Sequence, residues 1–262
     1  MKPDISVIIP SYNAEKYILQ TLESVRYQTY DGLIETIVVD DCSKDGSLEV
    51  VKAFARESEN YPNRPVRWFR NDVNSGVAEA RNTGAFESRG DYICYLDSDD
   101  YWDPEKIEKQ VELIEAWALK PGCDAMPVLF CTGRELVNES GESLGKVVHV
   151  PSVITYKEML KTNLVPCSSV MLKREAALEF PMERDDLVED YIDWLKIIKE
   201  YGPAAGVDEP LLKYRVMQGT RSANKIKAAK SQYKALRYVG ISPLPAFAYL
   251  ISYMINGVKK LK

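Results

Sequence analysis

The sequence has few of the residues from which disulfide frameworks, zinc sites and histidine-based active sites are made. Its five cysteines are odd in number, and no two of them have Cys-x-x-Cys spacing. We therefore expect no disulfide framework and no structural zinc site, but reduced and mostly buried cysteines. The single histidine, His149, stands in a strand-like Val-Val-His-Val run. We expect it to be structural, and a role beside a ligand or a metal stays open.

Long apolar runs are also missing. No stretch reaches the roughly 18 consecutive apolar residues that a membrane-spanning helix requires. The N-terminus lacks a charged segment followed by an apolar one, so we expect no signal peptide. These absences predict a cytoplasmic protein, and contact with the inner face of the cell membrane stays open.

Acidic residues are absent from the last part of the chain. Residues 210–262 carry a formal charge of +11, whereas residues 1–209 carry −16. Such a basic tail indicates an anionic partner, and the apolar segment 243–258 within it has the length of a helix that lies in a bilayer interface. We predict a peripheral membrane contact through residues 224–262, with packing on the domain as the alternative. No aromatic-basic recognition motif accompanies the charge, so we expect no nucleic acid partner.

The first half of the chain alternates between strand and helix patterns. The strand patterns cover residues 5–10, 35–40, 66–70 and 91–96, and the helix patterns cover residues 14–28, 47–58, 76–89 and 104–119. This order predicts an α/β fold with a mainly parallel sheet flanked by helices.

The second half is less regular. Strand patterns cover residues 126–137, 146–150, 168–172 and 211–217, and helix patterns cover residues 155–161, 188–201, 223–238 and 243–258. We find no internal repeat and no linker. A single domain with a mixed second half and a helical C-terminus fits this pattern best.

Polar residues follow three of the predicted parallel strands, at residues 10–13, 40–41 and 97–100. Ligands in such sheets bind beyond the carboxyl ends of the strands, so these residues are expected to line one crevice. Asp97 and Asp99 point the same way in an extended segment and repel each other unless a cation lies between them. Mn²⁺ and Mg²⁺ accept carboxylates together with substrate phosphates. A solvated acidic turn that caps the next helix is the alternative for so short a motif.

Two further groups are candidates for the same crevice. Asp40 can accept a hydrogen bond from a nucleobase, although capping of the next helix is equally consistent with its position. Arg81 lies about one turn into the helix that follows Asn74-Ser75-Gly76. Helix N-termini attract phosphates, so Arg81 contacts either a phosphate or the nearby aspartates.

Four blocks of sequence together resemble glycosyltransferase family 2. They are residues 6–13 (SVIIPSYN), 38–47 (VVDDCSKDGS), 74–82 (NSGVAEARN) and 95–100 (YLDSDD). The resemblance covers residues 5–105 and implies a GT-A fold with an inverting mechanism. It implies transfer of a sugar from a nucleotide diphosphate-sugar, expected to be a UDP-sugar, to a hydroxyl of a glycan or lipid-linked acceptor in surface polysaccharide synthesis.

The resemblance also assigns roles to residues of the first half. The implied donor-binding residues are Pro10, Tyr12, Asn13, Asp40, Asn74, Gly76, Arg81, Asp97, Ser98 and Asp99. In that family the residues after the first strand border the base and ribose, and the carboxylate that matches Asp40 contacts the base. Asp97 and Asp99 match the ligands of a divalent metal, Mn²⁺ or Mg²⁺, with Asp99 the more direct ligand.

In the second half, residues 187–194 (LVEDYIDW) resemble the family's Glu-Asp motif. The match implies that Asp190 is the catalytic base, and that Glu189 or Trp194 shapes the acceptor pocket. An acidic first turn favoured by the helix dipole is the alternative. Residues 213–215 and 219–222 fall where relatives carry residues near the donor phosphates.

These assignments divide the chain into a transferase domain, residues 1–222, and a C-terminal tail, residues 223–262. The domain consists of a nucleotide-sugar half, residues 1–105, and an acceptor half, residues 106–222. A sugar-phosphate nucleotidyltransferase is one alternative, but that class opens with a basic glycine-rich loop where this chain has Pro-Ser-Tyr-Asn-Ala. A nucleotide-sugar-binding protein without turnover is the other, and the presence of both Asp99 and Asp190 argues against it.

Overall fold

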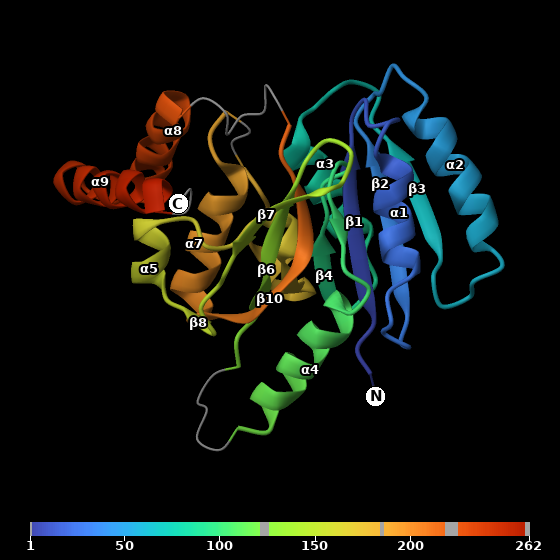
Figure 1. The fold of residues 1–262 in the computed structure, drawn as a ribbon, viewed down its shortest axis with the longest axis horizontal. Coiled ribbons are helices and arrows are strands. Elements are labelled where there is room, and N and C mark those ends of the chain that lie inside the picture. The colour runs from blue at the N-terminus through green and yellow to red at the C-terminus, as the bar shows by residue number, and fades with distance from the viewer. Residues whose placement is uncertain (1, 121–125, 184–185, 218–224, 260–262) are drawn as a thin grey trace.

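The computed structural model describes residues 2–120, 126–183, 186–217 and 225–259 (Figure 1). Within them a ten-stranded sheet has the order β3-β2-β1-β4-β9-β6-β10-β5, with β7 paired to β6 and β8 paired to β10. Helices cover both faces of this sheet. The predicted α/β class is confirmed.

The first half of the chain forms the parallel part of the sheet. Its strands are β1 (Ile5–Ser11), β2 (Ile34–Asp40), β3 (Val66–Arg70) and β4 (Tyr92–Tyr95), and its helices are α1 (Ile18–Arg26), α2 (Ser47–Ser58) and α3 (Val77–Glu87). Every residue of β1 and β2 is buried, as expected of strands covered on both faces. The helix predicted from residue 14 begins only at Ile18, because Asn13 has a left-handed φ of 50° and a turn follows it.

The second half adds mixed strands and most of the remaining helices. The strands are β5 (Tyr101–Trp102), β6 (Leu129–Val137), β7 (Ser143–Val148), β8 (Val153–Ile154), β9 (Met171–Lys173) and β10 (Ala204–Arg215). The helices are α4 (Lys106–Ala118), α5 (Tyr156–Lys161), α6 (Arg174–Glu179), α7 (Glu189–Tyr201), α8 (Lys225–Tyr238), α9 (Pro243–Lys259) and the short 3₁₀ helix η1 (Cys167–Ser169). β10 is longer than predicted. Its pairing with β6 is irregular between Val207 and Leu212, and the strand pattern in the sequence is interrupted there.

The hydrophobic core lies on both faces of the sheet. On one face α1, α2 and α4 cover residues such as Ile9 and Val38, and on the other face α3 and α5 to α9 enclose a cluster that includes Trp194.

A lysine is buried in the layer formed by α1, α2 and α4. Lys106 Nζ donates to Gln110 Oε1 at 2.7 Å and lies 3.8 Å from the centre of the Trp102 ring. Its burial lowers the pKa of this amine to about 8.

The C-terminal helices pack on the domain beside α5 and α7, at the left of Figure 1. α8 buries Ala235 and Leu236, and α9 buries Ala246. Among the helices that the structure describes, none combines the length and the apolar content needed to cross a bilayer.

The prediction of reduced thiols holds for Cys42, Cys94, Cys131 and Cys167, which are all free and mostly buried, and Cys123 lies outside the described residues.

Candidate active site

Three strand ends that are separate in sequence lie next to one another. In the parallel register Ser11 of β1 is opposite Asp40 of β2, and Ile8 is opposite Tyr95 of β4. The backbone N–H of Asp41 donates to the carbonyl of Ser11 at 2.8 Å. The polar residues that follow these strands therefore share one edge of the sheet, as the sequence predicted.

The two neighbouring aspartates after β2 have different surroundings. Asp41 accepts hydrogen bonds from the backbone N–H groups of Ser75 and Gly76 at 2.8 and 2.9 Å, and from Asn71 Nδ2 at 2.8 Å. It therefore fixes the turn before α3, whereas the alternative that the sequence left open was capping of the next helix, α2, by Asp40. Asp40 has one oxygen, Oδ2, that accepts from the N–H of Ser43 at 3.2 Å.

The other oxygen of Asp40 has an unmet hydrogen-bonding capacity. Asp40 is 1% exposed, and its Oδ1 has no hydrogen-bond partner among the described residues. Buried acceptors are normally paired, so an exception at the end of a strand is a site where a ligand can donate. Arg70 Nε lies 3.4 Å from Oδ2 and leaves Oδ1 available.

The remaining residues of the predicted donor site shape its backbone. Asn13 accepts at Oδ1 from the N–H of Lys44 at 2.9 Å, and Tyr12 beside it is exposed. Gly76 precedes α3 with a φ of 92°, which favours glycine. Asn74 Nδ2 donates to the carbonyl of Asp41 at 3.3 Å. Pro10, in contrast, is buried within β1.

The acidic turn, residues 97–100, follows β4 and is held in a fixed shape by hydrogen bonds. The N–H of Asp100 donates to the carbonyl of Asp97 at 3.0 Å, and the N–H of Asp97 donates to Ser168 Oγ at 3.1 Å. The carbonyl of Ser98 accepts from Thr21 Oγ1 at 3.0 Å. Ser168 belongs to η1, whose carbonyl oxygens accept from Trp102 and Gln110 of the layer around Lys106.

The electrostatics of this turn favour a cation at Asp99. Burial, and then the charge of Asp97, raise the pKa of the Asp99 carboxyl to about 6. Asp97 forms an ion pair with Arg81, with 2.6 Å between Oδ1 and Nη2. No group of three or more metal-ligating side chains occurs in the described part of the chain. The carboxylates of Asp97 and Asp99 are oxygen ligands of the kind that Mg²⁺ or Mn²⁺ accepts together with substrate phosphates and water, so their chemistry fits such an ion.

Arg81 connects the two halves of the site. Its guanidinium is nearly buried, and its Nη1 donates to Glu189 Oε1 at 3.1 Å while Nη2 binds Asp97. The next residue, Asn82, exchanges two hydrogen bonds with the backbone of Met182, at 2.8 and 2.9 Å. Adjacent residues of α3 thus fix both the acidic turn and the segment that leads into α7.

Asp190 lies in the first turn of α7, next to the Glu189 carboxylate that Arg81 binds. Burial, followed by the charge of Glu189, raises the pKa of the Asp190 carboxyl to about 7. A carboxylate with a pKa near neutrality is suited to proton abstraction, because it is more basic than an ordinary carboxylate and about half of it is ionised at neutral pH.

Trp194 does not lie where an acceptor contact requires it. It is 0% exposed, and its ring centre lies 6.2 Å from that of Tyr95 in the core. Residue 194 is about one helical turn beyond Asp190, and α7 enters the core within that turn. The placement contradicts a role for Trp194 in shaping an open acceptor pocket, and it identifies the tryptophan as a packing residue.

Residues 213–215, expected near the donor phosphates, bind other groups of the protein. Lys213 Nζ is paired with Glu135 Oε2 at 2.9 Å, and Arg215 Nε donates to the carbonyl of Asp99 at 2.7 Å. Residues 219–222 lie outside the described residues. His149 forms a surface pair with Asp208, with 3.0 Å between Nδ1 and Oδ1.

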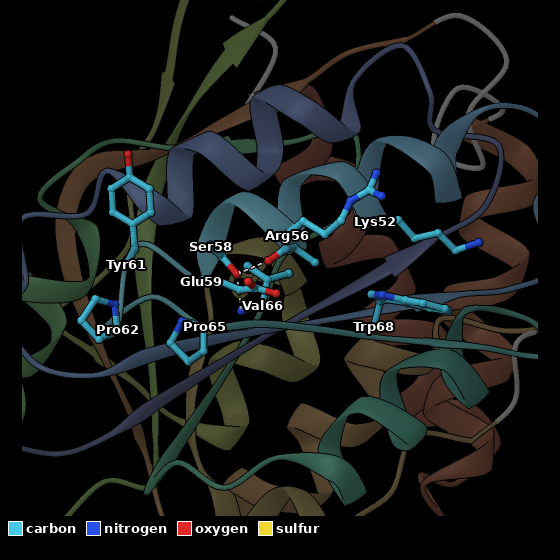
Figure 2. A pocket seen from close by; sticks show the side chains of 10 residues that line it. Lys52, Arg56, Ser58, Glu59, Tyr61, Pro62, Pro65, Val66 and Trp68 are labelled. Carbon is cyan, nitrogen blue, oxygen red and sulfur yellow. Dashed lines mark hydrogen bonds between the residues drawn. The ribbon is translucent and has the colours of Figure 1, made fainter.

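A separate cavity lies between α2 and the edge strand β3 (Figure 2). It has a volume of about 590 Å³ and presents the exposed aromatic side chains of Tyr61 and Trp68 beside Lys52 and Arg56. Glu59 is the one acidic residue in its lining. The carboxylates of the candidate site, at the strand ends and at the start of α7, do not line this cavity.

Comparisons with known proteins agree with the geometry. Residues 6–121 match the sequence model of the family described as "Glycosyl transferase family 2". The chain is 34% identical, over 260 residues, to the putative teichuronic acid biosynthesis glycosyltransferase TuaG of Bacillus subtilis, covering 99% of this chain and 98% of that protein. The chain belongs to glycosyltransferase family 2. This family 2 enzyme is also 33% identical to WfgD of Escherichia coli, a UDP-Glc:alpha-D-GlcNAc-diphosphoundecaprenol beta-1,3-glucosyltransferase, over 98% of this chain and 94% of that one.

Solved structures give the same fold for this glycosyltransferase. TarS of S. aureus, residues 1–349 in complex with UDP-GlcNAc, superposes with a TM-score of 0.71 at 17% identity, over 96% of this chain and 71% of that chain. The mannosyltransferase PcManGT of Pyrobaculum calidifontis, in complex with GDP-Man and Mn²⁺, superposes with a TM-score of 0.69 at 19% identity, over 96% of this chain and 69% of that chain. The expected GT-A fold is confirmed.

Proposed function

We propose that this glycosyltransferase moves a sugar from a UDP-sugar to a hydroxyl of a lipid-linked acceptor, with inversion, in surface polysaccharide synthesis. The observation that carries this proposal is the Arg81 bridge, which joins Asp97 of the acidic turn to Glu189 beside Asp190. The bridge brings the candidate donor-binding and base residues into one site. The UDP-glucose and diphosphoundecaprenol in the name of WfgD support the choice of donor and acceptor.

At the donor end, Asp40 and Asp99 have complementary tasks. Asp40 Oδ1 accepts a hydrogen bond from a ring N–H of the base, since it is buried and otherwise unpaired among the described residues. Asp99, with Asp97 beside it, would hold Mn²⁺ or Mg²⁺ together with the diphosphate. Such an ion supplies charge neutralisation to the departing diphosphate.

At the acceptor end, the Asp190 carboxylate takes the proton of the acceptor hydroxyl. The oxygen forms a bond to the anomeric carbon from the side opposite the diphosphate, while the bond between that carbon and the diphosphate oxygen breaks. UDP leaves with the electron pair, and the configuration at the anomeric carbon is inverted. Glu189, held by Arg81, keeps Asp190 basic enough for this step.

The proposal is tested by incubating the protein with several nucleotide sugars, Mn²⁺ or Mg²⁺, and a diphosphate-linked polyprenyl sugar. We expect release of UDP from one UDP-sugar, dependence on the acceptor, and loss of activity with a chelator. Turnover of no nucleotide sugar would contradict the transferase proposal. Unchanged turnover after removal of the metal would contradict the role of Asp99.

We also propose a peripheral contact between residues 224–262 and an anionic membrane, on its cytoplasmic face. Large apolar side chains of α9 are exposed at helical spacing: Leu244, Phe247, Ile251, Met254 and Ile255. They form one side of an amphipathic helix. Exposed Lys230, Lys234 and Arg237 of the adjacent α8 add the positive charge that attracts anionic lipid.

Point variants are the appropriate test of this contact, because deletion of α8 and α9 would uncover the core around Leu236 and Ala246. We expect Leu244→Ser combined with Phe247→Ser to lower sedimentation with vesicles that contain phosphatidylglycerol. A matched double variant of exposed residues elsewhere, Tyr27→Ser with Phe86→Ser, leaves sedimentation unchanged. Equal recovery of all three proteins in the supernatant would contradict the proposal.

A further inference from the structure

Arg215, the last residue of β10, is 3% exposed and lies against the acidic turn. Its Nε donates to the carbonyl of Asp99 at 2.7 Å, and its backbone N–H donates to Asp100 Oδ1 at 2.8 Å. Nη1 donates to the carbonyl of Glu139 at 2.6 Å, and Nη2 donates to Gln20 Oε1 at 2.7 Å. The guanidinium therefore joins the acidic turn to two other segments.

The partners of this guanidinium are all uncharged. They are carbonyl oxygens and one amide, and among the described residues no carboxylate forms an ion pair with Arg215. The rings of Tyr17 and Tyr101 lie beside it, with centres at 4.7 and 5.6 Å. A buried arginine without an ionic partner uses the planar geometry of its donors, which a lysine cannot reproduce.

The two segments that Arg215 reaches are α1 and the turn between β6 and β7, residues 138–141. These segments also contact one another or the acidic turn directly. Thr21 Oγ1 of α1 donates to the carbonyls of Ser98 and Asp100 at 3.0 and 2.7 Å. Beside the 138–141 turn, Tyr101 Oη of β5 donates to the carbonyl of Gly141 at 2.8 Å, and Lys16 Nζ, just before α1, lies 3.5 Å from Glu139 Oε2. Arg215 is thus the common point of α1, the 138–141 turn and the residues that would hold the donor diphosphate.

We propose that Arg215 is a positioning residue that fixes the backbone at Asp99 for binding of a metal-nucleoside diphosphate, and that it is not itself a phosphate ligand. This inference rests on the proposed function. Arg215 uses Nε, Nη1 and Nη2 on protein acceptors, so it acts through the acidic turn and the 138–141 turn. The base pocket at Asp40 lies at the end of another strand and does not depend on it.

The test compares Arg215→Lys and Arg215→Gln with the wild type, well below their melting temperatures. UDP binding with Mn²⁺ is followed by calorimetry, Mn²⁺ binding by electron paramagnetic resonance, and metal-free uridine binding by ligand-observed NMR. We expect both variants to bind UDP with Mn²⁺ about tenfold or more weakly, the effect of losing a charged hydrogen bond, and to bind uridine as the wild type does. Lys213→Gln, which alters a cation of the same strand, serves as the matched control.

The possible failures are distinguishable. Wild-type affinity for UDP with Mn²⁺ in Arg215→Lys would overturn the positioning role, since the charge alone would then suffice. An equal loss of uridine and UDP binding would overturn it too, because the residue would then support the whole fold. A wild type that binds neither UDP nor Mn²⁺ would instead contradict the proposed function.

Discussion

At the scale of single residues, the surroundings of Asp190 determine how the enzyme responds to pH. Its carboxyl has a pKa near 7, raised by burial and then by the charge of Glu189. A base acts only when ionised, so kcat/KM is expected to fall as the pH drops below about 7. Glu189→Gln removes the second cause and shifts this acidic limb to lower pH. A profile measured between about pH 5 and pH 9 checks the shift, and a limb that stays in place or moves upward contradicts it.

Asp190→Asn separates catalysis from donor binding. Loss of the base is expected to lower kcat by about 10²- to 10⁴-fold, while the affinity for UDP with Mn²⁺ changes little. The folded-state pKa of Asp190 exceeds its unfolded value, so ionisation destabilises the fold at alkaline pH. The variant is therefore expected to melt at a higher temperature than the wild type at about pH 9, and at the same temperature near pH 4. Near-wild-type turnover would remove Asp190 from the mechanism.

Substitutions of the neighbouring residues Asp40 and Asp41 are expected to have different effects, one on UDP binding and the other on stability. Asp41→Asn replaces one of two accepting oxygens with an amide nitrogen facing N–H donors, and we expect a loss of about 1 to 3 kcal/mol in unfolding free energy. Asp40→Asn places a donor where the base donates, so we expect about tenfold weaker UDP binding. Urea denaturation and calorimetry of both variants measure the contrast. A loss of stability in Asp40→Asn together with a loss of UDP binding in Asp41→Asn would contradict this expectation.

At the scale of elements, sequence periodicity predicted long strands and helices better than short ones. The limits of α2 and β3 agree with the pattern, and α2 has a clear apolar face that includes Leu48, Val51 and Phe54. β5 and β8 were not predicted, since two residues are too few to show a period, and α6 was not predicted either. The first part of β10 was missed because Gly206 and Asp208-Glu209-Pro210 interrupt it, and pairing with β6 overrides that local preference.

The contact between α3 and β1 depends on a small residue. A methyl group at Gly84 would overlap with the side chain of Ile8, so Gly84→Ala is expected to push α3 away from the sheet. We expect a loss of about 1 to 3 kcal/mol in unfolding free energy and, because Arg81 and Asn82 lie on the same helix, weaker donor binding. Urea denaturation measures the loss. The exposed residue Phe86 of the same helix provides a control, since Phe86→Ser should change stability by less than about 0.5 kcal/mol.

At the scale of the whole molecule, charge is segregated along the chain. Because the excess of positive charge is confined to residues 210–262, attraction to anionic vesicles is expected to weaken as salt screens it. Raising the salt concentration from about 0.1 M to 0.5 M should reduce the bound fraction several-fold without abolishing it, since the apolar side of α9 is insensitive to screening. Sedimentation at both concentrations measures the effect. Binding that does not respond to salt would leave no role for the basic residues.

The site was predictable where its residues are neighbours in sequence and unpredictable where the fold alone joins them. Asp97, Asp99 and Asp190 were named from motifs, and their roles stay predictions. The pairing of Arg81 with Glu189 spans 108 positions, and the support of the acidic turn by Ser168 spans 71. No local pattern encodes such distances. Trp194 was misassigned because a motif shows order along the chain but not the depth at which a helix enters the core.

The Arg81 bridge has a consequence for protein engineering. Arg81, in the predicted nucleotide-sugar half, pairs with Asp97 of the same half and with Glu189 of the predicted acceptor half. A chimera that takes its acceptor half from another family member therefore combines Arg81 of this chain with the glutamate of that other protein. Grafts that preserve this pair and the contact between Asn82 and Met182 keep the junction intact. A graft that breaks the ion pair leaves a buried charge there, and one that breaks the Asn82 contact leaves uncharged polar groups without their partners.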